Sequence, residues 1–240
     1  MNKFFKLGIA SALSVALLSA CGGSGGSETP PPAPLQQPIA VTSFDLLSGY
    51  KALIAAGRTN NFTVSGTCSG SATLTASIPS AATFEGTPAL AVASTSTSNL
   101  TNCNPASSAA TSTEYFDSNY NFIGHSAAGT EYGVFLTVPT PFPTSVKVND
   151  TAAFSIETIY TDSTKQIARG TRKLGYVIEA DGASTNTAIV NLITRDFNTA
   201  SQLLFTQQSR FRIAAGGPLT AVSIDVQSST NANHLVYTAK

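Results

Sequence analysis

The chain has 240 residues, which is enough for one domain of ordinary size or two small ones once processed segments are removed. Apolar residues make up 42% of the chain and allow a core, whereas charged residues make up 11%, less than half of the usual share of about 25%. The 13 basic and 13 acidic side chains balance, which argues against the basic surface that nucleic-acid-binding proteins need.

The first twenty residues have the features of a bacterial signal peptide. Lys3 and Lys6 form a short basic start, and an apolar run follows from Leu7 to Ala20. As a helix these 14 residues span roughly 21 Å, which is too short for the hydrocarbon core of a bilayer, about 30 Å thick. The pattern therefore predicts a cleaved signal peptide over residues 1–20 rather than a transmembrane helix.

The apolar run ends in Leu18, Ser19, Ala20 and Cys21, with Gly22 next. These four residues resemble the lipobox of bacterial lipoproteins at every position, although the resemblance covers only the start of the chain. In that family the cysteine thiol receives a diacylglyceryl group, and the new amino terminus is often acylated as well, palmitate being a typical chain. The resemblance implies that Cys21 is lipidated, and Gly22 resembles the subset sorted to the outer membrane of Gram-negative bacteria.

Residues 22–38 read GGSGGSETPPPAPLQQP and contain four glycines and five prolines. Together with Cys21 this segment is predicted to be a tether over residues 21–38, flexible first and polyproline-like afterwards. Its reach from the membrane is up to roughly 50 Å. The remaining residues, 39–240, form the predicted folded domain.

An amphipathic helix is predicted over residues 43–56, near the start of that domain. Ser43 is the expected N-cap, and Gly57 is expected to end the helix. The apolar side chains recur at helical spacing: Leu46, Leu47, Tyr50, Leu53 and Ile54.

After Arg58 the apolar pattern changes to a period of two, which is typical of β-strands. Residues 188–193, AIVNLI, are apolar on both sides and predict a central strand buried on both faces. With turn signals between the short strands, the sequence predicts a mainly β fold: an antiparallel meander, Greek key, sandwich or open barrel with one N-terminal helix. Two of the alternating sets are Phe154, Ile156, Thr158 and Tyr160, and Leu174, Tyr176 and Ile178.

The 29 serines and 31 threonines fit the same fold, because threonine suits a pleated surface and hydroxyls line a wet face without charge. Pro139, Pro141 and Pro143 fall in a segment that is either a subdomain boundary near residues 139–145 or a long surface loop.

The cysteines support an oxidising compartment. With Cys21 assigned to lipid, Cys68 and Cys103 remain as a pair, and we predict a disulfide between them that ties the first hairpins together. Neither lies in a CxxC motif and no histidine is near in sequence, so we predict no metal site and no cofactor.

One motif resembles a catalytic sequence. Residues 124–128, GHSAA, match the GxSxG nucleophile elbow except at the last position, with Ser126 as the nucleophile and His125 or His234 as the base. The strand–turn–helix context that this motif requires is absent from the pattern, since a strand is predicted directly afterwards. Asp117 begins an EF-hand-like run, but Phe122 occupies the position of the required glycine, and a hairpin turn explains the run better than a calcium site.

The runs YTDSTK (160–165), YVIEAD (176–181) and AIVNLI (188–193) resemble segments of uncharacterised β-rich envelope lipoproteins of Gram-negative bacteria. That resemblance implies no activity. We therefore expect a non-catalytic lipoprotein that is anchored by lipid in the cell envelope, in the outer membrane, and has a binding or structural role. Its expected partners are the membrane, an envelope protein or a small apolar ligand, without nucleic acid. The alternative is a small envelope serine hydrolase that uses Ser126.

Overall fold

The structure is a computed structural model that describes residues 42–103, 105–182, 184–230 and 233–240. The predicted signal peptide, Cys21 and the tether lie outside these residues. The described part contains a helix and a set of antiparallel strands. In chain order these are α1 (Leu46–Ala55), β1 (Arg58–Gly66), β2 (Ser69–Ala76), β3 (Ser80–Phe84), β4 (Thr87–Thr101), β5 (Ser107–Phe116), β6 (Phe122–Ala127), β7 (Glu131–Phe135), β8 (Thr151–Tyr160), β9 (Ala168–Ala180), β10 (Thr187–Asn198), β11 (Leu203–Ala214), β12 (Thr220–Ser228) and β13 (His234–Ala239).

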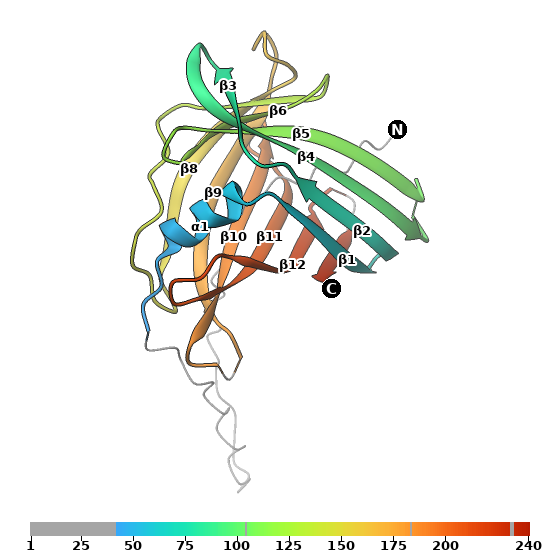
Figure 1. Cartoon of the computed structure of the whole chain (residues 1–240). Coiled ribbons are helices and arrows are strands. Elements are labelled where there is room, and N and C mark those ends of the chain that lie inside the picture. Colours follow the sequence, from blue (N-terminus) through green and yellow to red (C-terminus); the bar gives the residue numbers. More distant parts are fainter. Residues whose placement is uncertain (1–41, 104, 183, 231–232) are drawn as a thin grey trace, which may run out of the picture.

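The strands close into a 12-stranded antiparallel β-barrel (Figure 1). From β4 to β13 each strand pairs with the next in sequence, and β13 then pairs with β1, β1 with β2 and β2 with β4. The mainly β, antiparallel prediction is confirmed, but the barrel is closed where an open barrel or a sandwich was expected. Closure depends on β2–β4 and β1–β13 pairing between segments distant in sequence, for which local alternation gives no signal.

The strand left out of the ring, β3, pairs with the first part of β4, along the edge that β2 occupies further on, and its end reaches the outer face of the barrel. Its Phe84 stacks on the ring of Tyr115 with a centroid distance of 4.4 Å and lies 5.4 Å from that of Tyr132. Gly124 lies beneath Phe84, and a Cβ atom there would overlap the ring. The outer face of β5, β6 and β7 is therefore covered by aromatic packing.

Helix α1 begins at Leu46, later than predicted, because Asp45 rather than Ser43 is the N-cap. The Asp45 carboxylate accepts a hydrogen bond from the Ser48 backbone N–H at 2.9 Å, which satisfies one of the free donors of the first turn. At the other end Gly57 has a φ of +62°, the left-handed conformation that commonly terminates helices, as predicted.

The apolar face of α1 fills one end of the barrel. It packs in one core cluster with inward-facing residues of β9, β10 and β11, against which Figure 1 shows the helix. Gly49 permits this approach, since a Cβ atom on it would already lie 3.3 Å from the Gly217 carbonyl oxygen. The buried helix residues are Leu46, Gly49, Tyr50, Leu53 and Ile54.

The alternation is confirmed on β9, where Leu174, Tyr176 and Ile178 are buried, and residues 188–193 of β10 are buried throughout, as predicted. On β8 the prediction of which residues face inward is wrong beyond Phe154. A bulge between Ala153 and Ser155 shifts the register by one residue, which exchanges the two faces of the strand. Ile156 is consequently 44% exposed, whereas Glu157 is fully buried.

The predicted disulfide between Cys68 and Cys103 is present, with a Cα–Cα distance of 5.7 Å. It joins the β1–β2 turn to the β4–β5 turn, so it links the first hairpins as expected. The two cysteines pack in a second apolar cluster in the barrel, together with Phe62, Leu100 and Tyr237 among others.

The segment from residue 136 to residue 150 connects β7 and β8, which pair within the same barrel. Phe44 and Val146 exchange backbone hydrogen bonds of 2.8 and 2.9 Å, and the Thr140 N–H donates to the Phe154 carbonyl at 3.2 Å. The prolines of this segment therefore belong to a long connection held against α1 and β8.

Candidate functional site

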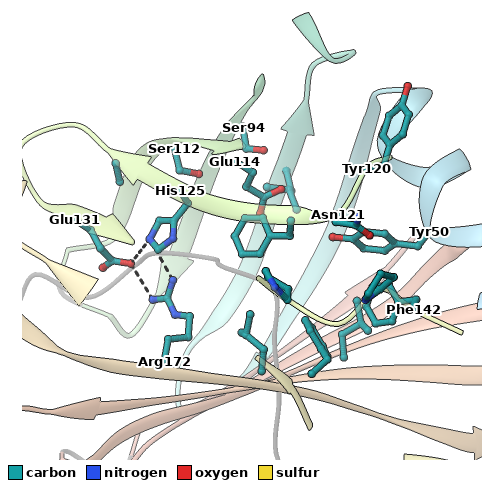
Figure 2. A pocket seen from close by; sticks show the side chains of 18 of the residues that line it. Tyr50, Ser94, Ser112, Glu114, Tyr120, Asn121, His125, Glu131, Phe142 and Arg172 are labelled. Atoms are coloured by element: carbon teal, nitrogen blue, oxygen red, sulfur yellow. Dashed lines mark hydrogen bonds and ion pairs between the residues drawn. The ribbon is translucent and has the colours of Figure 1, made fainter. Parts of the chain in front are cut away.

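A cavity of about 70 Å³ lies in the barrel between α1 and the middle of the strands (Figure 2). Its wall comes from α1, the 136–150 connection and strands β2, β4, β5, β6, β7, β8, β9 and β10. A water molecule needs roughly 10–15 Å³ measured in this way, so the cavity holds several waters or one small ligand. The lining residues used below are Tyr50, Ser94, Ser96, Ser112, Glu114, Tyr120, Phe122, His125, Glu131, Phe142, Phe154 and Arg172.

Serines make one wall of the cavity and explain why the space is open. Ser94 and Ser96 alternate with outward-facing threonines on β4, and Ser94 pairs with Ser112 on β5. Elsewhere the same inner surface carries large side chains such as Val92 and Phe116. Replacing such residues by serine removes volume from the interior and leaves hydroxyl groups facing the space.

Aromatic rings make the opposite wall. The ring of Phe142, from the 136–150 connection, lies edge-on to Tyr50 at 4.8 Å and to Phe154 at 5.0 Å between centroids. The centroid of the Phe142 ring also lies 5.8 Å from that of Tyr176, again in an edge-to-face arrangement. Edge-to-face contacts of this kind fix the rings in orientation, so the wall is preorganised.

Glu114 and Glu131 are the two acidic residues that line the cavity. Glu114 pairs with His125 in the β5–β6 register, so both side chains face the interior. Within the described part of the chain its carboxyl group forms no hydrogen bond or ion pair. Burial raises the pKa of this carboxyl group, although the positive charge of Arg58 partly opposes the shift.

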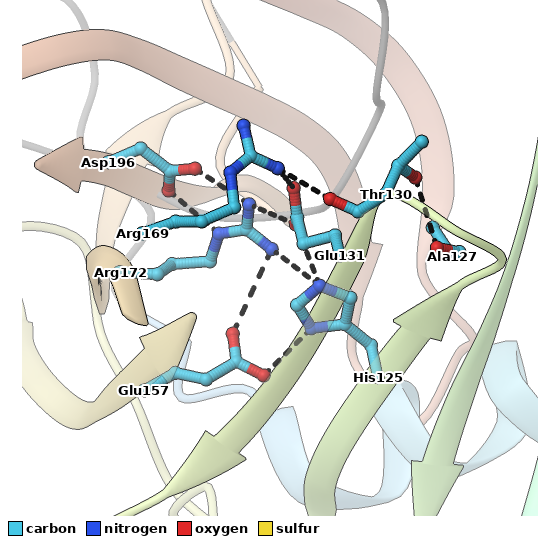
Figure 3. Close-up of polar contacts among 8 residues, drawn as sticks. All are labelled: His125, Ala127, Thr130, Glu131, Glu157, Arg169, Arg172 and Asp196. Carbon is cyan, nitrogen blue, oxygen red and sulfur yellow. Dashed lines mark hydrogen bonds and ion pairs between the residues drawn. The ribbon is translucent and has the colours of Figure 1, made fainter. Parts of the chain in front are cut away.

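A buried ionic network borders the cavity on the side away from α1 (Figure 3). Its centre is Arg172 on β9, which donates from Nε and Nη2 to the two carboxylate oxygens of Asp196, both at 2.7 Å. Nη2 also donates to Oε1 of Glu131 at 2.8 Å. The planar guanidinium matches these partners, and their charges outweigh the cost of burial and raise the pKa of Arg172 well above its usual value.

His125 lies between two carboxylates of this network. Its Nδ1 is 2.8 Å from Oε1 of Glu157, and its Nε2 is 2.8 Å from Oε1 of Glu131. Burial alone would lower the pKa of the imidazole, but the charge of Glu157 and the two hydrogen bonds raise it to about 9. At neutral pH the ring is therefore an imidazolium that donates from both nitrogens, which leaves no nitrogen to act as a base.

The structure separates the residues of the predicted hydrolase site. Ser126 lies on the outer face of β6, with its Oγ 3.3 Å from the Tyr115 hydroxyl, whereas the adjacent His125 faces the interior. The Nε2 atom of His234, on β13, is 3.1 Å from Asp225. Because β6 and β13 are five strands apart along the shorter way around the barrel, Ser126 and His234 do not meet.

The remaining candidates from the sequence are the calcium-like run at Asp117, a metal site and the lipidation site. The Asp117 carboxylate accepts the backbone N–H groups of Asn119 at 2.7 Å and Asn121 at 2.9 Å, so it stabilises a turn. Over the described ranges no cluster of three or more histidine, cysteine or acidic side chains is arranged to bind a metal ion. Cys21, the predicted lipidation site, lies outside the described residues.

Apart from His125, which was considered as a catalytic base, the polar residues of the cavity were not predicted as site residues from the sequence. One signal was available: Arg172 is in phase with Leu174 and Tyr176 on the inward face of β9. A charged residue on an apolar face indicates a buried ion pair or a binding site. Its partners come from other strands, and no pattern in the sequence links them to it.

Comparisons with protein-family models, with curated proteins and with solved structures find no match to this chain. In the described part of the chain, no helix has the length and hydropathy required to cross a membrane.

Proposed function

We propose that this protein is a lipid-anchored binding protein of the bacterial envelope, which holds a small molecule inside its β-barrel. The observation that carries the binding role is the cavity. It brings together free volume, hydroxyl groups, aromatic rings and the Glu114 carboxyl group, which forms no hydrogen bond or ion pair with the described residues. Sites for small molecules typically combine an apolar wall with a few convergent polar groups.

The proposed role is non-catalytic. Both ring nitrogens of His125 bond to carboxylates, and Ser126 has a tyrosine rather than a base beside it. A nucleophile and a base within hydrogen-bond reach, which acyl-transfer chemistry requires, are therefore not assembled at the predicted motif.

The anchor is proposed from the lipobox-like sequence that ends at Cys21, with residues 22–38 as the tether and the outer membrane as the destination. Two or more acyl chains give stable attachment, since each buried methylene contributes about 0.8 kcal/mol. Growth with labelled palmitate tests this proposal. Cys21→Ala should abolish incorporation, whereas a Cys68→Ser/Cys103→Ser variant should keep it; label retained by Cys21→Ala would contradict the anchor.

The binding role is tested by purifying the full chain from bacterial membranes in a mild detergent and identifying small molecules released on denaturation by mass spectrometry. Ser94→Leu places a larger side chain in the cavity and should abolish recovery of the compound. Thr95→Leu adds a similar side chain on the exposed face of the same strand and should leave recovery unchanged. Equal recovery from both variants, or no compound from the wild-type protein, would contradict the proposed role.

A further inference from the structure

Given the binding role proposed above, we infer that the cavity takes a small organic cation, the protonated amino group of a short alkylamine. Glu114 is its counter-ion, and the rings of Tyr50, Phe142 and Phe154 surround its apolar part.

The charges of the ionic network are already matched. Arg172 bonds to Asp196 and Glu131, His125 bonds to Glu131 and Glu157, and the half-exposed Arg169 lies 3.7 Å from Glu131. Three cations thus face three carboxylates. The Nε and Nη2 donors of Arg172 and both ring nitrogens of His125 are directed at carboxylate oxygens of the protein. An anionic ligand would have to compete with these carboxylates for its donors.

Glu114 has no such match. The positive charges of Arg58, His125 and Arg172 act on it through space, but none of these side chains bonds to it. Nη1 of Arg58 donates to the Leu53 carbonyl at 3.4 Å, and the Arg58 side chain lines a separate recess of the barrel. Holding a carboxylate in the partly buried interior of a barrel costs free energy unless a partner supplies hydrogen bonds and opposite charge. An ammonium group supplies both, with up to three N–H donors that the carboxylate and the nearby Ser94 and Ser112 hydroxyls accept.

The aromatic wall provides the surface for the apolar part of the ligand. Aromatic rings that line a pocket bury alkyl groups, while a few polar groups fix the orientation of the ligand. Tyr50, Phe142 and Phe154 form one contiguous group, and Tyr120 and Phe122 also line the cavity. In Figure 2, Glu114 lies between His125 on one side and Asn121 and Tyr50 on the other.

The size of the cavity limits the ligand. Its volume of about 70 Å³ is roughly half of the 150 Å³ that holds benzene in an engineered apolar cavity. The buried part of the ligand is therefore limited to about half the size of benzene, as in a primary ammonium group on a chain of two or three carbons. Propylammonium is the probe of this class that we select.

The test measures binding to the full chain in detergent micelles by isothermal titration calorimetry at constant pH and ionic strength. Three probes of similar size are compared: propylammonium, neutral 1-propanol and anionic acetate. We expect propylammonium to bind at least tenfold more tightly than either of the other two.

Glu114→Gln keeps the shape of the side chain and removes its charge, so it should weaken propylammonium at least tenfold and leave 1-propanol unchanged. Glu179→Gln is the matched control, because Glu179 lies on the outer face of β9 with Arg210 as its partner at 3.0 Å. Phe142→Leu, which removes a ring, should weaken propylammonium several-fold. Near-ultraviolet circular dichroism of each variant establishes that the barrel is intact.

Two results would overturn the inference while leaving the proposed binding role in place. These are 1-propanol or acetate binding as tightly as propylammonium, or Glu114→Gln binding propylammonium as the wild-type protein does. If none of the three probes binds, the inference also fails, and the proposed binding role is then decided by the recovery experiment with Ser94→Leu and Thr95→Leu alone.

Discussion

The absence of a side chain on Gly133 leaves the space in which the Glu157 carboxylate reaches His125. A Cβ atom on Gly133 would overlap Oε1 of Glu157 and Cε1 of His125, the two groups joined by the 2.8 Å hydrogen bond. Gly133 pairs with His125 on β6, so its position is fixed by two ladders of the barrel and cannot shift alone.

We predict that Gly133→Ala destabilises the barrel by roughly 1–3 kcal/mol, because overpacking a buried site forces its neighbours out of position. It should also lower the pKa of His125 by breaking the bond to Glu157. Urea unfolding measures the first effect, and imidazole titration by NMR measures the second. Gly217→Ala is the control, since a Cβ atom there meets its nearest neighbours at an ordinary 3.7 Å. Equal stability of the two variants would contradict the steric role of Gly133.

The ionic network predicts how stability depends on pH. The pKa of His125 rises from 6.5 in the unfolded chain to about 9 in the barrel, where Glu131, Glu157 and Arg172 face it. The folded state therefore binds a proton more tightly than the unfolded state. This contribution, about 3 kcal/mol, is fully present below pH 6.5 and is lost as the pH rises through about 9.

Unfolding free energies measured by urea between pH 6 and pH 10 check this prediction. The wild-type protein should lose stability across the window, whereas His125→Gln should lack this loss. His234→Gln should behave as the wild type, because His234 is half-exposed on β13. A His125→Gln variant that loses stability with the wild-type slope would assign the pH dependence to other groups.

Arg172 is buried and Arg212 is exposed, so we predict that removing them lowers the free energy of unfolding by different amounts. Arg172→Ala leaves Asp196 and Glu131 as buried carboxylates without their main partner, which costs about 3–5 kcal/mol. Arg212 also pairs with an aspartate, Asp181, at 2.6 Å, but its side chain is 51% exposed. Water therefore replaces this partner, and Arg212→Ala should cost at most about 1 kcal/mol. Chemical denaturation of both variants measures the difference, and similar costs would contradict the role assigned to Arg172.

The predictability of the fold differed between local and long-range features. The helix near residue 46, the inward face of Leu174, Tyr176 and Ile178, and the doubly buried run at residues 188–193 all depend on spacing within one element, and the sequence predicts them. Closure of the barrel depends on β1 pairing with β13, from the other end of the domain, and on β2 pairing with β4; no local spacing encodes either pairing.

The site was less predictable than the fold. Its ionic network takes one or two groups from each of five strands, and one of them, Glu157, faces the interior only because of the bulge after Ala153. Read with an unbroken period of two, the same residue falls on the outer face and Ile156 on the inner one. The GHSAA run drew attention to Ser126 as a possible nucleophile. In the structure Ser126 lies on the outer face, and its neighbour His125 is the residue that faces the interior.

The disulfide predicts a stability difference that is independent of the ionic network. Cys68 and Cys103 are 35 residues apart, and on the chain-entropy estimate a loop of this length stabilises the folded state by roughly 3–4 kcal/mol. The Cys68→Ser/Cys103→Ser variant should therefore unfold at lower urea concentration, with far-ultraviolet circular dichroism unchanged because the β1–β2 and β2–β4 ladders remain. Reduction of the wild-type protein should reproduce the loss and should not affect the variant. Mass mapping without reductant that finds two free thiols in protein from the bacterial envelope would contradict the bond itself.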